Sequence, residues 1–259
     1  MKANEIDTAG ERLSELLATF KLPTAASQIV PLVVDAGHEA TLPLLAEIFE
    51  LEQQDRWERR VQRLLRAAKL PPGKIFDTFD DTRLQRPLAR TIRELRSGAF
   101  LEQAQNVLCF GLPGTGKTHI ACALGHALVE AGHSVLFVAT YKLVQDLLGA
   151  KRDLELPRAL RKLDHFELII LDDLGYVQQG AEEMEVLFTL MAERYERRSM
   201  LITSNLVFSQ WDQIFKNPMT TAAAIDRLVH HSVILELDVE SYRTQDAAHR
   251  TASQGEDRQ

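Results

Sequence analysis

One segment of eight residues limits the fold of this chain more than any other. Residues 111–118 read Gly-Leu-Pro-Gly-Thr-Gly-Lys-Thr, and they match every fixed position of the pattern Gly-x-x-x-x-Gly-Lys-Ser/Thr. The apolar residues 106–110 precede the segment, and a helical pattern follows it. Glycines allow backbone conformations that other residues avoid. The segment therefore predicts a tight loop between a buried strand and the first turn of a helix.

A loop of this kind is typical of a nucleotide phosphate site. Its backbone N–H groups surround the α- and β-phosphates, Lys117 reaches the β- and γ-phosphates, and the Thr118 hydroxyl binds Mg²⁺. The positive end of the following helix adds to the attraction. The complete match disfavours the alternative, a glycine-rich turn without a ligand. We therefore expect ATP and Mg²⁺ as cofactors, with the nucleotide held by Gly111, Pro113, Gly114, Thr115, Gly116, Lys117, Thr118 and His119.

The composition is that of an ordinary globular protein. Of the 259 residues, 45% are hydrophobic and 26% charged, which fits one large α/β domain or a core with a smaller appendage. The apolar stretches are only as long as strands, and the first residues lack the apolar core of a signal peptide, so we expect a cytoplasmic protein without a membrane segment. Cys109 and Cys122 lie in apolar settings and predict buried, reduced thiols.

The chain divides into a helical part and an alternating part. Residues 1–70 have helical patterns, and Pro71-Pro72-Gly73 ends the last of them. We predict a helical, DNA-binding domain over 1–75, an ATPase domain over 76–243, and a disordered tail over 244–259. Beyond the connector, five strand-like segments alternate with helices and predict an α/β fold with a five-stranded parallel sheet covered on both faces. These strands are residues 106–110, 134–139, 168–172, 200–204 and 233–237.

Three further positions complete the predicted catalytic site. The strand at 168–172 ends in Asp172 and Asp173, and the carboxyl edge of a parallel sheet is where such residues meet a phosphate loop. We expect Asp172 to hold Mg²⁺ through its water shell and Asp173 to polarise an attacking water. Asn205, which ends the next strand, is a candidate for contact with that water and the γ-phosphate. Without the loop, an ordinary acidic turn would be the better interpretation of the two aspartates.

Arg227 precedes the last strand and could reach the γ-phosphate of a neighbouring subunit. The alternative is a surface arginine paired with Asp226. The adjacent His230 and His231 have no further ligands at metal spacing, so we expect no metal site there.

A basic helix precedes the ATPase domain. At 100° per residue its arginines fall within an arc of about 120°, and an apolar set that includes Trp57 and Ala68 falls opposite. A solvated charged face is the alternative, but such faces usually mix signs, and this stripe does not. We expect it to bind duplex DNA through phosphates. A second basic segment over 151–162 could contact DNA or a subunit interface. The stripe consists of Arg56, Arg59, Arg60, Arg63 and Arg66.

Four segments carry a resemblance to a known family. They are G-L-P-G-T-G-K-T, L-D-D-L-G-Y, I-T-S-N and A-I-D-R-L, in this order. Together they resemble the AAA+ ATPases of the helicase-loader and initiator branch, and more closely the IstB-like helper ATPases of insertion-sequence transposition. The similarity extends to A-E-R-Y-E-R-R-S at 192–199, E-S-Y-R at 240–243, and the amino-terminal L-P-T-A-A and D-R-W-E-R-R-V-Q-R-L-L-R-A-A-K-L-P segments, so it spans nearly the whole chain.

The resemblance implies a homo-oligomer that assembles on duplex DNA with ATP bridging its subunits, is nucleoid-associated when bound, and selects targets for an IstA-like transposase. Asp173 replaces the usual glutamate and is one methylene shorter, which favours slow hydrolysis. The short remainder after residue 237 implies an absent or truncated lid, with Arg243 as the nearby candidate for a second sensor. In related initiators the finger arginine lies a few residues beyond Arg227, where this chain has the two histidines.

Two rival functions are compatible with the same phosphate loop. A replicative helicase loader of the DnaC type would have the same core, but its amino-terminal domain would bind a helicase. A small-molecule kinase could use the same loop. The kinase is disfavoured because Asn205 and Arg227 suit an assembled ATPase and no acceptor-binding insertion is visible.

Overall fold

The computed structural model describes residues 2–175, 180–206, 210–211, 228–239 and 241–242. The chain forms two compact units, Met1–Arg63 and Leu64–Gln259. The break falls inside helix α3 (Leu42–Ala68), upstream of the boundary between residues 75 and 76 that the sequence predicts. The predicted tail at 244–259 lies outside the described residues. No helix in the described ranges is long and apolar enough to cross a bilayer.

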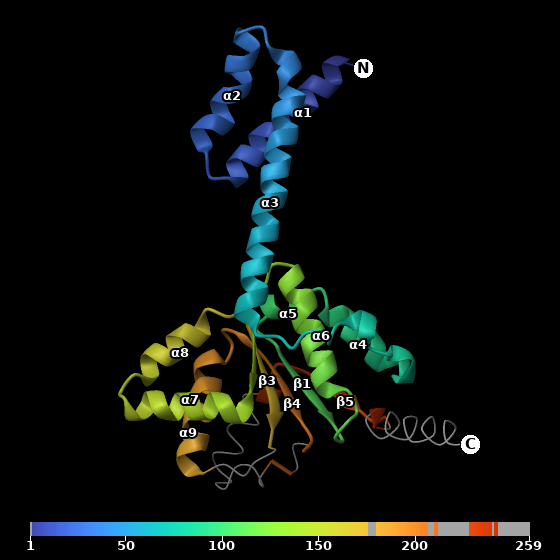
Figure 1. Cartoon of the computed structure of the whole chain (residues 1–259), viewed down its shortest axis with the longest axis vertical. Coiled ribbons are helices and arrows are strands. Elements are labelled where there is room, and N and C mark those ends of the chain that lie inside the picture. Colours follow the sequence, from blue (N-terminus) through green and yellow to red (C-terminus); the bar gives the residue numbers. More distant parts are fainter. Residues whose placement is uncertain (1, 176–179, 207–209, 212–227, 240, 243–259) are drawn as a thin grey trace, which may run out of the picture. The chain divides into compact units, whose positions relative to one another are not determined.

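The first unit is helical, as predicted. Helices α1 (Lys2–Thr19) and α2 (Pro23–Asp35) pack on each other, and the short η1 (Glu39–Thr41) leads into α3 (Figure 1). Pro23 begins α2 because its fixed φ suits the first helical turn. Gly37 follows α2 with a φ of 72°, a left-handed conformation that terminates helices. The small core of this unit contains Leu13, Leu17, Leu42 and Ala46.

The second unit opens with a connector of short elements. The single turns η2 (Phe76–Thr78) and η3 (Asp81–Arg83) precede α4 (Arg86–Leu95) and α5 (Ala99–Glu102). The Asp80 carboxylate accepts hydrogen bonds from the backbone N–H and hydroxyl of Thr82, which fixes the start of η3. The connector then leads into the first strand of the sheet.

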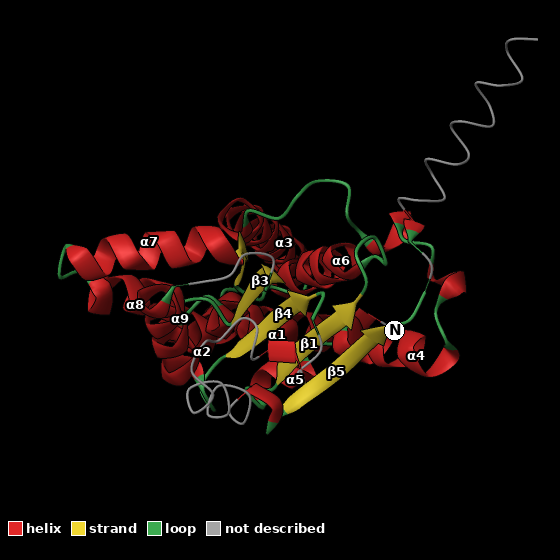
Figure 2. Ribbon diagram, turned by 90° about the horizontal axis from the view of Figure 1, so that it is seen from below, coloured by secondary structure: helices red, strands yellow, loops and turns green. Residues whose placement is uncertain are grey.

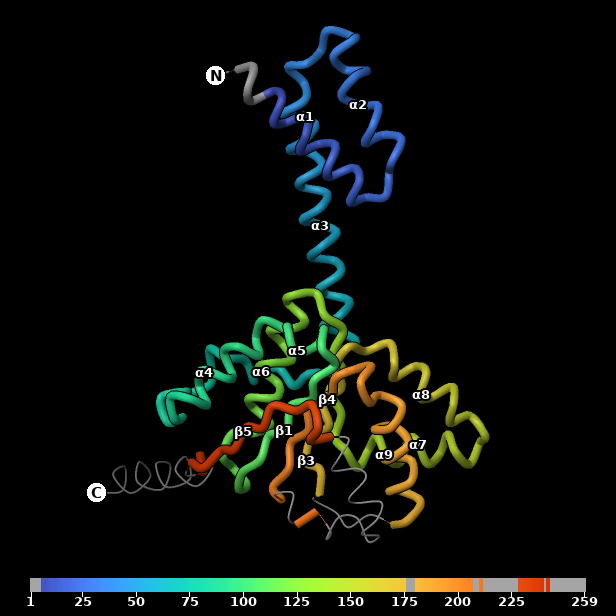
Figure 3. The backbone as a smooth tube through the Cα atoms, turned by 180° about the vertical axis from the view of Figure 1, so that it is seen from behind, coloured from blue at the N-terminus to red at the C-terminus, as the bar shows by residue number. Residues whose placement is uncertain are grey.

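The five predicted strands form one parallel sheet (Figure 2). They are β1 (Asn106–Gly111), β2 (Val135–Ala139), β3 (Leu168–Leu174), β4 (Ser199–Ser204) and β5 (Ser232–Leu237). The spatial order is β2-β3-β4-β1-β5, and the backbone trace shows β5 beside β1 (Figure 3). Because every pairing is parallel, the carboxyl ends of all five strands meet at one edge.

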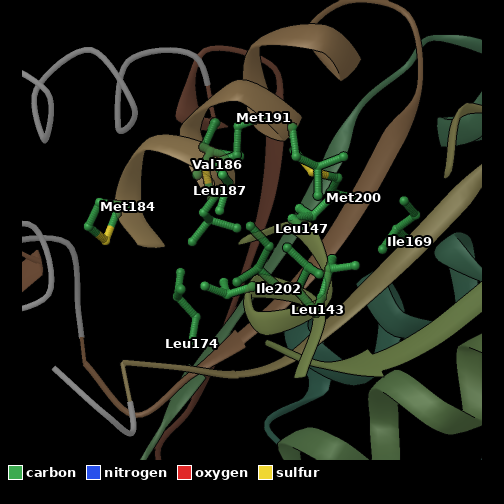
Figure 4. Close-up of a cluster of buried hydrophobic side chains, with 14 of the residues drawn as sticks. Leu143, Leu147, Ile169, Leu174, Met184, Val186, Leu187, Met191, Met200 and Ile202 are labelled. Atoms are coloured by element: carbon green, nitrogen blue, oxygen red, sulfur yellow. The ribbon is translucent and has the colours of Figure 1, made fainter. Parts of the chain in front are cut away.

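Helices cover both faces of the sheet. Helix α6 (Lys117–Glu130) packs on β1, β2, β3 and β4, while α7 (Thr140–Arg152) packs on β2 and β3 and on α9 (Ala181–Arg194). Figure 4 shows side chains of α7 and α9 packed against those of β3 and β4. Helix α8 (Leu156–Asp164), which the sequence analysis missed, packs against α7 and α9. Cys109 and Cys122 are free and buried, as predicted, and burial raises the pKa of each thiol to about 12.

Arg194 anchors the edge of the sheet opposite the carboxyl ends. This buried side chain donates hydrogen bonds to four backbone carbonyl oxygens. They belong to residues just before or at the beginning of β3 and β4 and at the end of α8. Burial lowers the pKa of Arg194 to about 10, so the guanidinium is charged at neutral pH. Its acceptors are the carbonyls of Leu163, Phe166, Glu167 and Ser199.

Candidate nucleotide site

The predicted loop connects β1 directly to α6, and its glycines have conformations that side chains disfavour. Gly114 and Gly116 have φ values of 86° and 95°. Space is also limited: a Cβ at Gly114 would lie 2.1 Å from Ser241 Oγ, and one at Gly116 would lie 3.0 Å from the Phe79 ring. The glycines are therefore required both by the path of the backbone and by the side chains packed on it.

Lys117 lies inside this loop. Its side chain is only 6% exposed, and its Nζ donates hydrogen bonds to the carbonyl oxygens of Gly111 at 2.7 Å and Leu112 at 2.8 Å. Thr115, also buried, donates its hydroxyl to the same Leu112 carbonyl at 2.8 Å. The ammonium group is thus held beside the inward-facing loop, where a phosphate would be bound.

Thr118 and Asp172, predicted to share a metal ion, lie together. Thr118 Oγ1 donates a hydrogen bond to Asp172 Oδ1 at 2.9 Å. A hydroxyl and a carboxylate are the hard oxygen ligands that Mg²⁺ prefers, so this donor set fits the ion. Burial raises the pKa of Asp172, a hydrogen bond from Thr203 opposes that shift, and the charge of Asp173 adds to it.

Thr203 is a site residue that sequence reasoning missed. Its Oγ1 donates to Asp172 Oδ1 at 2.7 Å and accepts a hydrogen bond from the Asp173 backbone N–H at 2.9 Å. It lies fully buried on β4, next to β3 in the sheet. One hydroxyl therefore fixes both acidic residues.

Asp173 adopts a backbone conformation that differs from that of the rest of its strand. Its φ is 59°, and the pairing of β3 with β4 shifts register between Leu171 and Leu174. As a result the Asp173 side chain is exposed while Asp172 beside it is buried. Asp173 and Asn205 both line the same cavity, as the sequence predicts for two residues that act on one water.

A cavity of about 570 Å³ brings the predicted residues together. Its wall includes loop residues, the beginning of α6 and the ends of β3 and β4. The connector and the segment after β5 add residues that sequence reasoning missed. The complete lining is Lys74, Thr78, Phe79, Asp80, Arg83, Pro113, Gly114, Gly116, Lys117, Thr118, His119, Asp173, Asn205 and Tyr242.

His119 ties the connector to α6. Its Nε2 lies 3.2 Å from Thr78 Oγ1 and 3.0 Å from the Ile75 carbonyl oxygen. Its ring centre lies 5.2 Å from that of Phe79. The predicted nucleotide residue His119 thus also positions the connector against the cavity. Arg227 and Arg243, the candidate finger and second sensor, lie outside the described residues.

The basic stripe on α3 differs from expectation in its charge. Arg56 pairs with Glu52 at 2.5 Å, and Arg59 with Asp55 at 2.6 Å, so acidic side chains one turn earlier give this part of the helix mixed sign. Arg56 also lies 4.4 Å from the centre of the Phe20 ring. Trp57, expected on the packed side, is 46% exposed. The interpretation of a single-signed stripe was therefore wrong at its amino-terminal end.

The rest of the stripe, Arg60, Arg63 and Arg66, is exposed. Arg63 and Arg66 have no ion-pair partner among the described residues. The second basic segment is partly neutralised, because Lys151 pairs with Glu185 and Arg158 with Glu155. The arginines of α3 without an ion pair among the described residues therefore lie toward its carboxyl-terminal end.

The strand order and the loop between β1 and α6 together define an α/β protein with a phosphate loop. Solved structures agree in fold: the DnaC helicase loader aligns with a TM-score of 0.53 at 21% identity, covering 66% of this chain and 100% of that one. AMPPCP-bound DnaA from Aquifex aeolicus aligns with a TM-score of 0.56 at 16% identity, covering 66% of this chain and 52% of DnaA.

Residues 16–250 match the family described as IstB-like ATP binding proteins, and the chain belongs to that family. An insertion sequence ATP-binding protein of Sinorhizobium fredii is 43% identical over 94% of this chain and 82% of its own length. The IS21 insertion sequence ATP-binding protein of Pseudomonas aeruginosa is 36% identical over 89% and 88%, respectively. The resemblance drawn from the four sequence segments is thereby confirmed.

Proposed function

We propose that this protein is an Mg²⁺-dependent ATPase that assembles on duplex DNA and selects targets for the transposase of its insertion sequence. The observation that carries the proposal is the convergence of Lys117, Thr118, Asp173 and Asn205 on one cavity, with the Asp172 carboxylate bonded to Thr118. Family membership supports the link to insertion sequences.

The cavity supplies the groups that phosphoryl transfer to water requires. The loop N–H groups and Lys117 bind the phosphates, and a bound Mg²⁺, held by Thr118 and Asp172, would neutralise charge on them. The exposed Asp173 carboxylate orients the attacking water and accepts its proton. Asn205, on the same wall, donates its amide to the γ-phosphate or the water. Turnover is slow because the aspartate reaches less far than a glutamate.

DNA contact is assigned to α3, with Arg63 and Arg66 as its principal phosphate-binding side chains. Phosphate contacts carry no sequence information directly, so one subunit binds all duplexes with similar affinity. Assembly of several subunits adds their contacts and gives avidity. A bent duplex within the assembly would mark the target, at a deformation cost of order 1–6 kcal/mol.

The test compares two partners of the ATP-bound protein on duplex DNA. The transposase encoded beside it and the host replicative helicase are mixed separately with the complex, and co-elution is measured. Lys117→Ala protein is the control for ATP dependence. Capture of the transposase supports the proposal. Capture of the helicase alone would instead establish the helicase-loader function.

Action across subunits is tested with mixtures. Arg227→Ala subunits retain the Asp173 base, and Asp173→Asn subunits retain the arginine, so a mixed interface can combine both intact groups. We expect part of the ATPase activity to return in the mixture. No return in assemblies shown by mass spectrometry to be mixed would rule out Arg227 as a finger acting in trans.

A further inference from the structure

Tyr242, which follows β5 far along the second unit's sequence, bridges two segments that border the cavity, the phosphate loop and the connector. Its backbone N–H donates a hydrogen bond to the Gly114 carbonyl oxygen at 3.0 Å, within the phosphate loop. Its hydroxyl donates to the Asp80 carbonyl oxygen at 2.8 Å, within the connector. Tyr242 is the residue through which the segment after β5 holds the loop and the connector together.

Packing around the Tyr242 ring reinforces these two bonds. The Arg83 guanidinium lies 4.4 Å from the ring centre, within the range of a cation–π interaction. The Phe79 ring centre lies 6.2 Å away, and Arg83 is itself paired with the Asp80 carboxylate at 3.3 Å. Burial raises the pKa of the Tyr242 hydroxyl, so the hydroxyl stays protonated and able to donate at neutral pH.

The contact reaches the loop backbone itself. Ser241 Oγ occupies the space where a Cβ of residue 114 would lie, and a Cβ at Gly116 would lie 3.6 Å from the Tyr242 ring. Glycine at both positions lets residues 241–242 approach the loop closely. Asp80, Arg83, Gly114 and Tyr242 all line the cavity, so this contact forms part of its wall.

We propose that Tyr242 is a positioning residue that clasps the phosphate loop to the connector and sets how slowly bound nucleotide leaves. The inference rests on the proposed nucleotide site. A nucleotide in the cavity contacts both the loop and the connector, so separation of these walls speeds its release. Separation breaks the Tyr242 bonds to Gly114 and Asp80 and the contact with Arg83. A partner that lifts residues 241–242 from the loop would therefore accelerate nucleotide exchange.

The experiment measures dissociation of a fluorescent ADP analogue from the full-length protein by stopped flow. Tyr242→Ala should release it about 30-fold faster, since it loses a hydrogen bond and a cation–π contact of about 1 kcal/mol each, and every 1.4 kcal/mol is a factor of ten. Tyr242→Phe retains the ring and loses only the hydrogen bond of the hydroxyl, so it should show a smaller increase, of about fivefold. Arg83→Gln keeps a polar side chain without the cation and should also release faster. Tyr141→Ala, at a 62% exposed tyrosine on α7, is the matched control and should not change the rate.

A purely structural role would lower the melting temperature of the nucleotide-free protein and leave the release rates of folded variants unchanged. The clasp instead predicts faster release from folded Tyr242→Phe and Arg83→Gln, whether or not their melting temperatures fall. Release at the wild-type rate from both variants and from Tyr242→Ala would overturn the clasp and leave the nucleotide site intact. A wild-type protein that binds no nucleotide would instead overturn the proposed function.

Discussion

The Thr203 hydroxyl on β4 donates a hydrogen bond of 2.7 Å to the Asp172 carboxylate on β3. The same oxygen accepts the Asp173 N–H. Thr203→Val keeps the shape, but it removes a donor from a buried carboxylate and leaves that N–H without its acceptor. We expect a loss of about 1–3 kcal/mol in the free energy of unfolding and a fall in ATP turnover. Urea denaturation and a phosphate-release assay measure the two effects, and Thr203→Ser should retain turnover. Wild-type stability and turnover in the valine variant would contradict this role.

The raised pKa of Asp172 predicts how stability depends on pH. Burial is the main cause. A carboxyl with a higher pKa in the folded state binds more protons when folded, so the free energy of unfolding falls as pH rises from the unfolded-state pKa through the folded-state value. Asp172→Asn should therefore lose less stability between pH 4 and pH 7 than the wild type, in protein free of metal and nucleotide. Asp146→Asn, at an exposed position on α7, is the control. An unchanged pH dependence in Asp172→Asn would refute the assignment.

Lys117→Ala should weaken ATP binding at least tenfold, because a hydrogen bond to a charged group contributes about 1.5–3 kcal/mol. Fluorescence titration with an ATP analogue measures the affinity. Lys142→Ala removes an exposed lysine from α7 and should bind like the wild type. Equal affinities for the two variants would exclude Lys117 from the phosphate site.

Asp173→Asn should retain ATP affinity and lose turnover by about 100-fold, the scale of a missing general base. The reason is that the amide preserves size and hydrogen bonding but cannot accept the proton of the attacking water. Parallel measurements of binding and phosphate release separate the two effects. If affinity fell as far as turnover, Asp173 would be a metal ligand and not the base.

Arg63 and Arg56 should differ in their contribution to DNA binding. Arg63 is exposed and without an ion pair among the described side chains, whereas Arg56 is held by Glu52 and Phe20. Arg63→Ala should reduce the slope of log K against log salt by about 0.9. Arg56→Ala should change the slope less and the stability of the helical unit more. Anisotropy titrations of duplex DNA at several salt concentrations measure the slopes. A larger slope change at Arg56 would reverse the assignment.

Local sequence was sufficient to predict those parts of the candidate site that are defined by particular residue types at a fixed spacing. The loop at 111–118 requires its glycines, and the Asp172–Asp173 pair ends an unmistakably apolar run, so both were predicted. The alternation of strand and helix patterns was likewise sufficient to predict a parallel sheet, because helical crossovers connect parallel strands.

Contacts distant in sequence could not be predicted in the same way. Thr203 is an ordinary strand residue until the register of β3 and β4 places it against Asp172. Tyr242 and Asp80 are separated by 162 positions. The charge of the arginine stripe was predicted wrongly because only residues from Arg56 onward were considered. Its acidic partners, Glu52 and Asp55, precede Arg56, and each lies four residues before the arginine that it pairs with.

Arg194 donates hydrogen bonds to four backbone carbonyls at the edge of the sheet where β3 and β4 begin. These bonds make that edge rigid, whereas the candidate nucleotide site lies at the opposite edge. Because the adjacent strands β3 and β4 are fixed at their beginnings, Asp172 and Thr203 near their carboxyl ends keep their relative positions when a ligand binds or dissociates. Loss of the Arg194 side chain would allow β3 and β4 to shift relative to each other. The shift would displace Asp172 and Thr203 at the other end of these strands. Position 194 should therefore tolerate substitution as poorly as the residues of the proposed nucleotide site, although it lies at the opposite edge of the sheet.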